Sequence, residues 1–119
     1  MVTTPAKVTA GLIARRAAGS GAMTILPCDN LPENGEAFAR VITDCARAVD
    51  PSLVPWIEEN IAFATCMVDR ITPATTDEDR AEIAEKFGYE DASPVPTEAF
   101  SEWVVAGEFP AGRPRWEDA

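Results

Sequence analysis

Short apolar runs alternate along this chain with segments of helical periodicity. Three such runs occupy residues 23–26, 61–64 and 100–105, and each has the length expected of a strand. In residues 36–49 the apolar side chains recur every three or four positions, which is the spacing of one helix face. Strands separated by helices are connected by crossovers, so this order predicts an α/β structure with a small, mostly parallel sheet flanked by helices.

Local signals at the ends of the helical segments support this assignment. The segment at residues 5–18 is rich in Ala, Leu and Arg and ends at a Gly-Ser-Gly turn. Asp50, followed by proline, predicts the N-cap of a short helix. Thr76 and Asp79 have the spacing of a capping box, so we expect a helix over residues 77–87 that ends at the following glycine.

The length and charge of the chain limit its classes of partner. A chain of 119 residues suffices for one domain with one core. Ten basic and twenty acidic residues give a net charge of -10, which repels nucleic-acid phosphates and anionic lipid headgroups. No apolar run approaches the roughly 18 residues of a membrane span, and the first residues lack the pattern of a signal peptide. We therefore expect a cytoplasmic protein that binds neither nucleic acid nor membranes.

Cysteine and histidine usage limits the chemistry. The three cysteines, Cys28, Cys45 and Cys66, lie far apart in the sequence, and the chain has no histidine. No Cys/His spacing typical of a zinc site can be written, so we expect no metal site. An odd number of cysteines favours reduced thiols over a framework of disulfides. Without histidine, a general base near neutral pH has to be a perturbed Asp, Glu, Lys or Cys, or has to come from another chain or domain.

The ends of the predicted strands are the expected place for a binding site. In open α/β sheets, ligands bind outside the carboxyl ends of the strands. The residues concerned are 28–30, 65–70 and 106–108. Spacing alone assigns no substrate to them, because they contain neither a phosphate-binding glycine loop nor a nucleophile paired with a base.

Three motifs at these strand ends resemble those of a known family. In chain order they are TILPCDNLPENG at residues 24–35, MVDRITPATT at residues 67–76, and WVV with a following Phe and Gly-Arg-Pro within residues 103–114. Together they resemble the long-chain polyol dehydrogenase family, typified by mannitol 2-dehydrogenase and fructuronate reductase. The resemblance implies that residues 1–119 are a single partial domain, the later part of the family's Rossmann-like N-terminal domain. It also implies NAD or NADP as cofactor.

The resemblance assigns roles to five residues. Thr65 stands where the family has an asparagine that helps to polarise the substrate oxygen, which implies a catalytic role for the Thr65 hydroxyl. A threonine donates from a shorter side chain than asparagine does, so the geometry at this position differs. The remaining residues, implied to bind or orient cofactor or substrate, are Asn30, Asn34, Asp69 and Arg70.

Other motif positions also depart from the family. Cys66 replaces a serine that precedes the Met-Val-Asp-Arg motif, and Pro27 replaces a serine that precedes Cys-Asp-Asn. Ala106 and Gly107 replace an acidic pair, which removes a carboxylate from a strand end.

The resemblance also places two catalytic features outside this sequence. The family's glycine-rich pyrophosphate loop is expected before residue 1, and its catalytic lysine after residue 119. We therefore expect a truncated or fragmentary NAD(P)-dependent oxidoreductase that transfers a hydride at the CH-OH group of polyols or sugar acids and is inactive alone. Its partners would be the missing N- and C-terminal parts of the enzyme or a complementing chain.

A non-catalytic remnant that acts as a small interaction protein is the alternative. In either case an incomplete sheet predicts self-association through its open edge.

Overall fold

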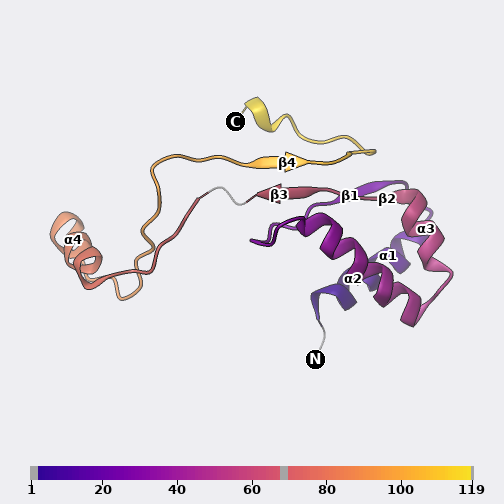
Figure 1. Ribbon diagram of the computed structural model, residues 1–119, viewed down its shortest axis with the longest axis horizontal. Helices are drawn as coiled ribbons and strands as arrows, with labels where there is room; N and C mark the ends of the chain where they lie inside the picture. The colour runs from indigo at the N-terminus through magenta and orange to yellow at the C-terminus, as the bar shows by residue number, and fades with distance from the viewer. Residues whose placement is uncertain (1–2, 68–69, 119) are drawn as a thin grey trace. The chain divides into compact units, whose positions relative to one another are not determined.

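The computed structural model describes residues 3–67 and 70–118, which fall into two compact units (Figure 1). The first unit combines the described residues of 1–67 with those of 104–119, and the second comprises those of 68–103. That the chain is a single partial domain stays a prediction.

The first helix begins and ends where its sequence predicts. Helix α1 (Thr4–Ala17) is preceded by Thr3, whose hydroxyl accepts a hydrogen bond from the Ala6 N–H at 3.4 Å. After the helix, Gly19 adopts a left-handed conformation with φ 63°, which favours glycine and ends the helix. The predicted helix over residues 5–18 is therefore confirmed to within one residue at each end.

Two strands of the first unit form a parallel sheet through a helical crossover. Strand β1 (Met23–Ile25) pairs with β2 (Ile61–Phe63), with Met23 opposite Ile61 and Ile25 opposite Phe63. The connection contains α2 (Asn34–Val49) and α3 (Leu53–Asn60). This arrangement, visible in Figure 1, confirms the predicted α/β class with a small parallel sheet flanked by helices.

The core of the first unit lies where α1, α2 and α3 meet β2. Its buried side chains are all aliphatic and come from these four elements: Leu12, Ile42, Ala46, Leu53, Ile57 and Ile61. Burial of each larger one stabilises the fold by about 1.5–3 kcal/mol. The apolar side chains of α2 recur every three or four residues because one face of this helix packs on the core, as the sequence predicts.

The third predicted strand pairs differently from expectation. Strand β4 (Val104–Ala106) is antiparallel to β3 (Thr65–Met67), with Thr65 opposite Ala106 and Met67 opposite Val104. The sequence predicts residues 65–70 as a polar cluster at the end of a strand, and residues 100–105 as a strand of the mostly parallel sheet. Instead, the chain leaves β2 at the buried Ala64 and enters a second two-stranded sheet.

Two helix starts also differ from the sequence prediction. Helix α2 begins two residues earlier than the predicted residue 36, after Glu33 in a left-handed conformation with φ 54°. Helix α3 begins at Leu53, because Asp50 first organises a turn. The Asp50 carboxylate accepts hydrogen bonds from the Ser52 N–H at 3.0 Å and the Ser52 hydroxyl at 2.6 Å. Asp50 therefore caps this turn, which precedes the helix proper.

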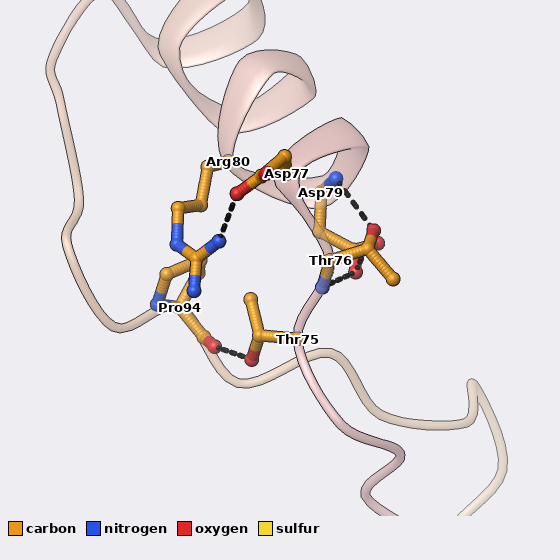
Figure 2. A network of polar contacts seen from close by, with 6 residues as sticks. All are labelled: Thr75, Thr76, Asp77, Asp79, Arg80 and Pro94. Carbon is orange, nitrogen blue, oxygen red and sulfur yellow. Dashed lines mark hydrogen bonds and ion pairs between the residues drawn. The ribbon is translucent and has the colours of Figure 1, made fainter.

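The second unit contains helix α4 (Asp77–Phe87), whose capping box is confirmed. The Thr76 hydroxyl accepts from the Asp79 N–H at 3.2 Å, and the Asp79 carboxylate accepts from the Thr76 N–H at 2.7 Å (Figure 2). Gly88 ends the helix with φ 73°. No residue of α4 is buried. Just before the helix, the Thr75 hydroxyl donates to the Pro94 carbonyl at 2.6 Å. None of the described helices is both long and apolar enough to cross a membrane.

Candidate functional site

Asn34, in the first turn of α2, organises the region that follows β1 and β2. Its side chain is buried, and its Nδ2 donates to the Asp29 carbonyl and to the Cys66 carbonyl, both at 2.8 Å. Its Oδ1 accepts from the Cys66 N–H at 3.1 Å. Both N–H bonds of the carboxamide are therefore used within the protein, and an oxygen lone pair is the remaining hydrogen-bonding capacity.

Gly35 allows the N-terminal end of α2 to approach the chain between β2 and β3. A Cβ at this position would lie 2.5 Å from the Ala64 carbonyl oxygen and 2.7 Å from the Thr65 hydroxyl oxygen. Such distances are far inside van der Waals contact, so only glycine fits without a backbone shift. The Thr65 hydroxyl is thus close to the first turn of α2.

A third segment reaches the same place from beyond β4. A Cβ at Gly107, which has φ 144°, would lie 2.7 Å from the Ala64 Cβ. The Thr24 hydroxyl of β1 donates to the Glu108 carbonyl at 2.9 Å. At both Gly35 and Gly107, the space that a Cβ would take is therefore occupied by other atoms of this chain.

A small, open hollow of about 160 Å³ lies in this region. It is lined by the loop before α2 and by β3 and β4: Leu31, Pro32, Glu33, Thr65, Cys66, Met67, Val104 and Ala106. Sites for whole cofactors have volumes of about 300–1,000 Å³. The hollow suits a few water molecules or one small functional group of a larger ligand.

The structure brings some of the predicted site residues together. Thr65 lines the hollow, and Asn34 is buried next to it through its bonds to Cys66. Asn30 is exposed in the loop after β1. Arg70 is exposed and belongs to the second unit, whereas Asp69 lies outside the described residues. The roles implied for these five residues stay predictions.

Two residues of this region have a structural role that the sequence does not predict. Gly35 permits the close approach to Ala64, and the backbone of Cys66 bonds to Asn34. The Asn-Gly pair at residues 34–35 was a usable signal, because a small residue beside a polar one permits close backbone packing. The partner of Asn34 lies 32 residues away, and no local pattern identifies it.

The described residues do not fit a complete dinucleotide on their own. A dinucleotide fold binds pyrophosphate at a glycine-rich turn between a strand and the helix that follows it. Here the helix after β1 is α2, and Gly35 in its first turn faces the Ala64 carbonyl. Gly19 and Gly21 precede β1 instead of following it. Within the part of the chain that the structure describes, no group of three or more His, Cys, Asp or Glu residues could hold a metal ion.

Comparison with protein families and curated sequences gives consistent matches. The sequence model of the mannitol dehydrogenase Rossmann domain matches residues 2–118. Mannitol 2-dehydrogenase of Phaeosphaeria nodorum is 46% identical over 110 residues, which are 92% of this chain and 19% of that protein. D-mannonate oxidoreductase of Escherichia coli is 44% identical over 103 residues, 87% of this chain and 21% of that protein.

Two solved structures have the same fold over almost the whole chain. D-sorbitol dehydrogenase in its substrate-free form superposes with a TM-score of 0.79 at 39% identity, covering 97% of this chain and 24% of that one. The ternary complex of Pseudomonas fluorescens mannitol 2-dehydrogenase with NAD and D-mannitol gives a TM-score of 0.77 at 40% identity, covering 98% and 24%. The chain thus spans about a quarter of the length of these structures.

Proposed function

The chain belongs to the mannitol dehydrogenase family, and from this premise we propose that it is part of an NAD(P)-dependent oxidoreductase acting on the CH-OH group of polyols or sugar acids. One observation carries the proposal: nearly the whole chain shares its fold with a mannitol 2-dehydrogenase whose complex holds NAD and D-mannitol. The proposed activity belongs to a larger assembly, since this chain spans about a quarter of that relative.

In this proposal the cofactor, NAD or NADP, supplies the hydride chemistry. The pyrophosphate groups would be bound by residues outside this chain, because the spaces at Gly35 and Gly107 are filled by Ala64 and Thr65. We therefore expect the chain alone to be inactive and to bind the cofactor weakly or not at all.

The proposed contribution of this chain is the rim of the site. Thr65 lines the hollow of about 160 Å³, and its hydroxyl would donate a hydrogen bond to the substrate oxygen as negative charge develops there. Asn34 would fix the loop that carries Asn30 relative to β3 through its three hydrogen bonds. Asp69 and Arg70 are proposed to orient cofactor or substrate from the segment that follows β3.

The proposed partner is the rest of the enzyme, on the same polypeptide or on a complementing chain. Within the described residues, β1 pairs with β2 along one edge, and its other edge carries no strand. Next to β1, an apolar hollow of about 320 Å³ is lined by α1 and β1 residues that include Val8, Leu12, Met23 and Ile25. Additional strands and helices would complete the sheet and fill this hollow. Without them, two copies of the chain would associate through the same edge.

We propose that this oxidoreductase is cytoplasmic. The described structure holds all three cysteines as free thiols, and cytoplasmic reductants keep thiols in that state.

A chimera tests the proposed function. Residues 2–118 would replace the matching segment of the Pseudomonas fluorescens mannitol 2-dehydrogenase, and mannitol-dependent reduction of NAD would be measured. We expect measurable turnover, a rise in kcat for Thr65→Asn, and a loss of about 10-fold or more for Thr65→Val. Thr65→Ser, which retains the hydroxyl, is the matched control.

The outcomes separate the proposals. A chimera that folds and assembles but stays inactive, even with Thr65→Asn, would favour the non-catalytic interaction protein. Micromolar binding of NADH by the 119-residue chain alone would contradict the placement of the pyrophosphate site outside it. The intact mass of the product in its source cells shows whether the remaining parts are on the same polypeptide.

A further inference from the structure

The loop after β1 is held against β3 at the position of two cysteines. Cys66, on β3, donates a hydrogen bond from its Sγ to the Pro27 carbonyl oxygen at 3.2 Å. The Asn34 carboxamide bonds to the Asp29 carbonyl on one side and to the Cys66 carbonyl on the other, both at 2.8 Å. Cys28 lies between Pro27 and Asp29, so these bonds fix the backbone on both sides of it.

This arrangement places the Cys66 sulfur next to the backbone of Cys28. The Pro27 carbonyl belongs to the peptide unit that ends at the Cys28 Cα, about 2.8 Å from its oxygen by standard peptide dimensions. The Cys66 Sγ is therefore within about 6 Å of the Cys28 Cα. Because the S–S bond of a disulfide is about 2.05 Å long, the bridge requires the Cys28 side chain to rotate toward the Cys66 Sγ and the loop after β1 to move closer to β3.

The surroundings of the Cys28 thiol raise its pKa above the usual value. Burial contributes most, followed by the neighbouring Cys66 side chain. Cys28 is nevertheless exposed, whereas Cys66 is buried with 5% of its surface accessible. An oxidant in solution would therefore meet Cys28 first.

We infer that Cys28 and Cys66 form a reversible disulfide that ties the loop after β1 to β3 when the protein meets hydrogen peroxide. The Cys28 thiolate attacks one peroxide oxygen, the O–O bond breaks, and a sulfenic acid and one water form. The Cys66 sulfur then attacks the Cys28 sulfur, the S–O bond breaks, and a second water leaves. Two thiols lose two protons and two electrons, and one peroxide becomes two waters. Excess dithiol reverses the reaction by thiol–disulfide exchange.

This inference does not depend on the proposed function, because it concerns the fold of this chain alone. The cross-link would nevertheless lie beside the hollow that Thr65 lines, since Cys66 lines the same hollow. The third cysteine, Cys45, belongs to α2 and takes no part in the bridge.

The test treats the 119-residue chain with hydrogen peroxide and counts its free thiols. We expect the count to fall from three to one, with a mass loss of about 2 Da and a proteolytic fragment that links Cys28 to Cys66. The melting temperature should rise and return to its original value after dithiothreitol. Because the pKa of Cys28 is raised, the rate should increase with pH across the alkaline range.

Three serine variants provide the controls. Cys45→Ser should still lose both of its thiols, whereas Cys28→Ser and Cys66→Ser should form no intramolecular bridge. Cys66→Ser retains a hydroxyl donor for the Pro27 carbonyl, and Cys28→Ser changes an exposed side chain, so both should fold. A mass gain of about 16 or 32 Da on Cys28 in the unmutated chain, disulfide-linked dimers as the main product, or three unreacted thiols would each overturn the inference.

Discussion

Asn34 and Cys66 exchange two hydrogen bonds although 32 residues separate them in the sequence. The Asn34 Nδ2 donates to the Cys66 carbonyl at 2.8 Å, and the Cys66 N–H donates to the Asn34 Oδ1 at 3.1 Å. The carboxamide thereby pairs with β3 as a neighbouring strand would. These hydrogen bonds allow the polar Asn34 side chain to be buried, because each of its N–H groups has an acceptor.

Replacement of Asn34 by alanine should destabilise the chain strongly. The substitution leaves the buried N–H of Cys66 without its acceptor, and the carbonyls of Asp29 and Cys66 without the Asn34 donor. We expect the free energy of unfolding to fall by about 3 kcal/mol. Urea denaturation followed by circular dichroism measures this loss. Asn30→Ala, at an exposed position in the same loop, is the control and should change stability by less than about 0.5 kcal/mol. Equal effects of the two substitutions would contradict the structural role of Asn34.

Replacement of Gly35 by alanine should also be destabilising, for a steric reason. The new Cβ would lie 2.5 Å from the Ala64 carbonyl oxygen, and such overpacking costs about 1–3 kcal/mol. Gly11→Ala is a matched control in α1, where the new Cβ has no neighbour within 4 Å. It should stabilise the chain by about 0.5–1 kcal/mol because alanine favours the helix. Thermal melts of the two variants should therefore shift in opposite directions, and a neutral Gly35→Ala would show that α2 does not pack this closely on Ala64.

Local signals predicted the helices well, because each depends on residues close in sequence. The Thr76–Asp79 capping box and the glycine after residue 18 lie within one turn of the helices they delimit. The start of α3 was displaced because Asp50 first forms a turn with Ser52.

Long-range pairing was beyond local signals. Strands of three residues have too short a pattern to reveal a partner, and β3 pairs with β4 across 39 residues at the Cys66–Val105 position. The parallel orientation of β1 and β2 agrees with the predicted mostly parallel sheet, because a helical crossover favours parallel strands. The resemblance names Thr65 and Asn34, which lie in or beside the hollow, and their roles stay predictions. The buried hydrogen bonds between Asn34 and Cys66 form only in the tertiary structure, because the two residues are 32 positions apart. No local sequence pattern predicts them.

The ion pair between Arg16 and Asp50 should make the stability of the first unit depend on pH. Hydrogen bonds from Ser52 and then from Arg16 lower the pKa of the Asp50 carboxyl in the folded state. The charged form therefore contributes stability that is present above the unfolded-state pKa, near 4, and is lost as the pH falls through the lower folded-state value.

Asp50→Asn should reduce the fall in melting temperature below about pH 4, measured between pH 2.5 and 7. Asp44→Asn, which removes the exposed Asp44–Arg47 pair, is the control and should leave the profile close to that of the unmutated chain. Identical acid profiles for the Asp50→Asn variant and the unmutated chain would refute the assigned contribution. High salt should weaken the dependence, because both side chains are partly accessible, 29% for Arg16 and 31% for Asp50.

The capping box of α4 should decide whether this helix persists, because no residue of α4 is buried. Thr76→Ala removes the acceptor of the Asp79 N–H (Figure 2), at a cost of about 1 kcal/mol to the helix. Isolated helices of this length are marginal in water, so the loss should appear as faster amide exchange over residues 77–87. Thr76→Ser retains the hydroxyl and should leave exchange unchanged. Amides of the core helix α2 provide the internal reference. If Thr76→Ala left exchange in α4 unchanged relative to Thr76→Ser, the contact of Thr75 with the Pro94 carbonyl, and not the cap, would be what holds α4 in place.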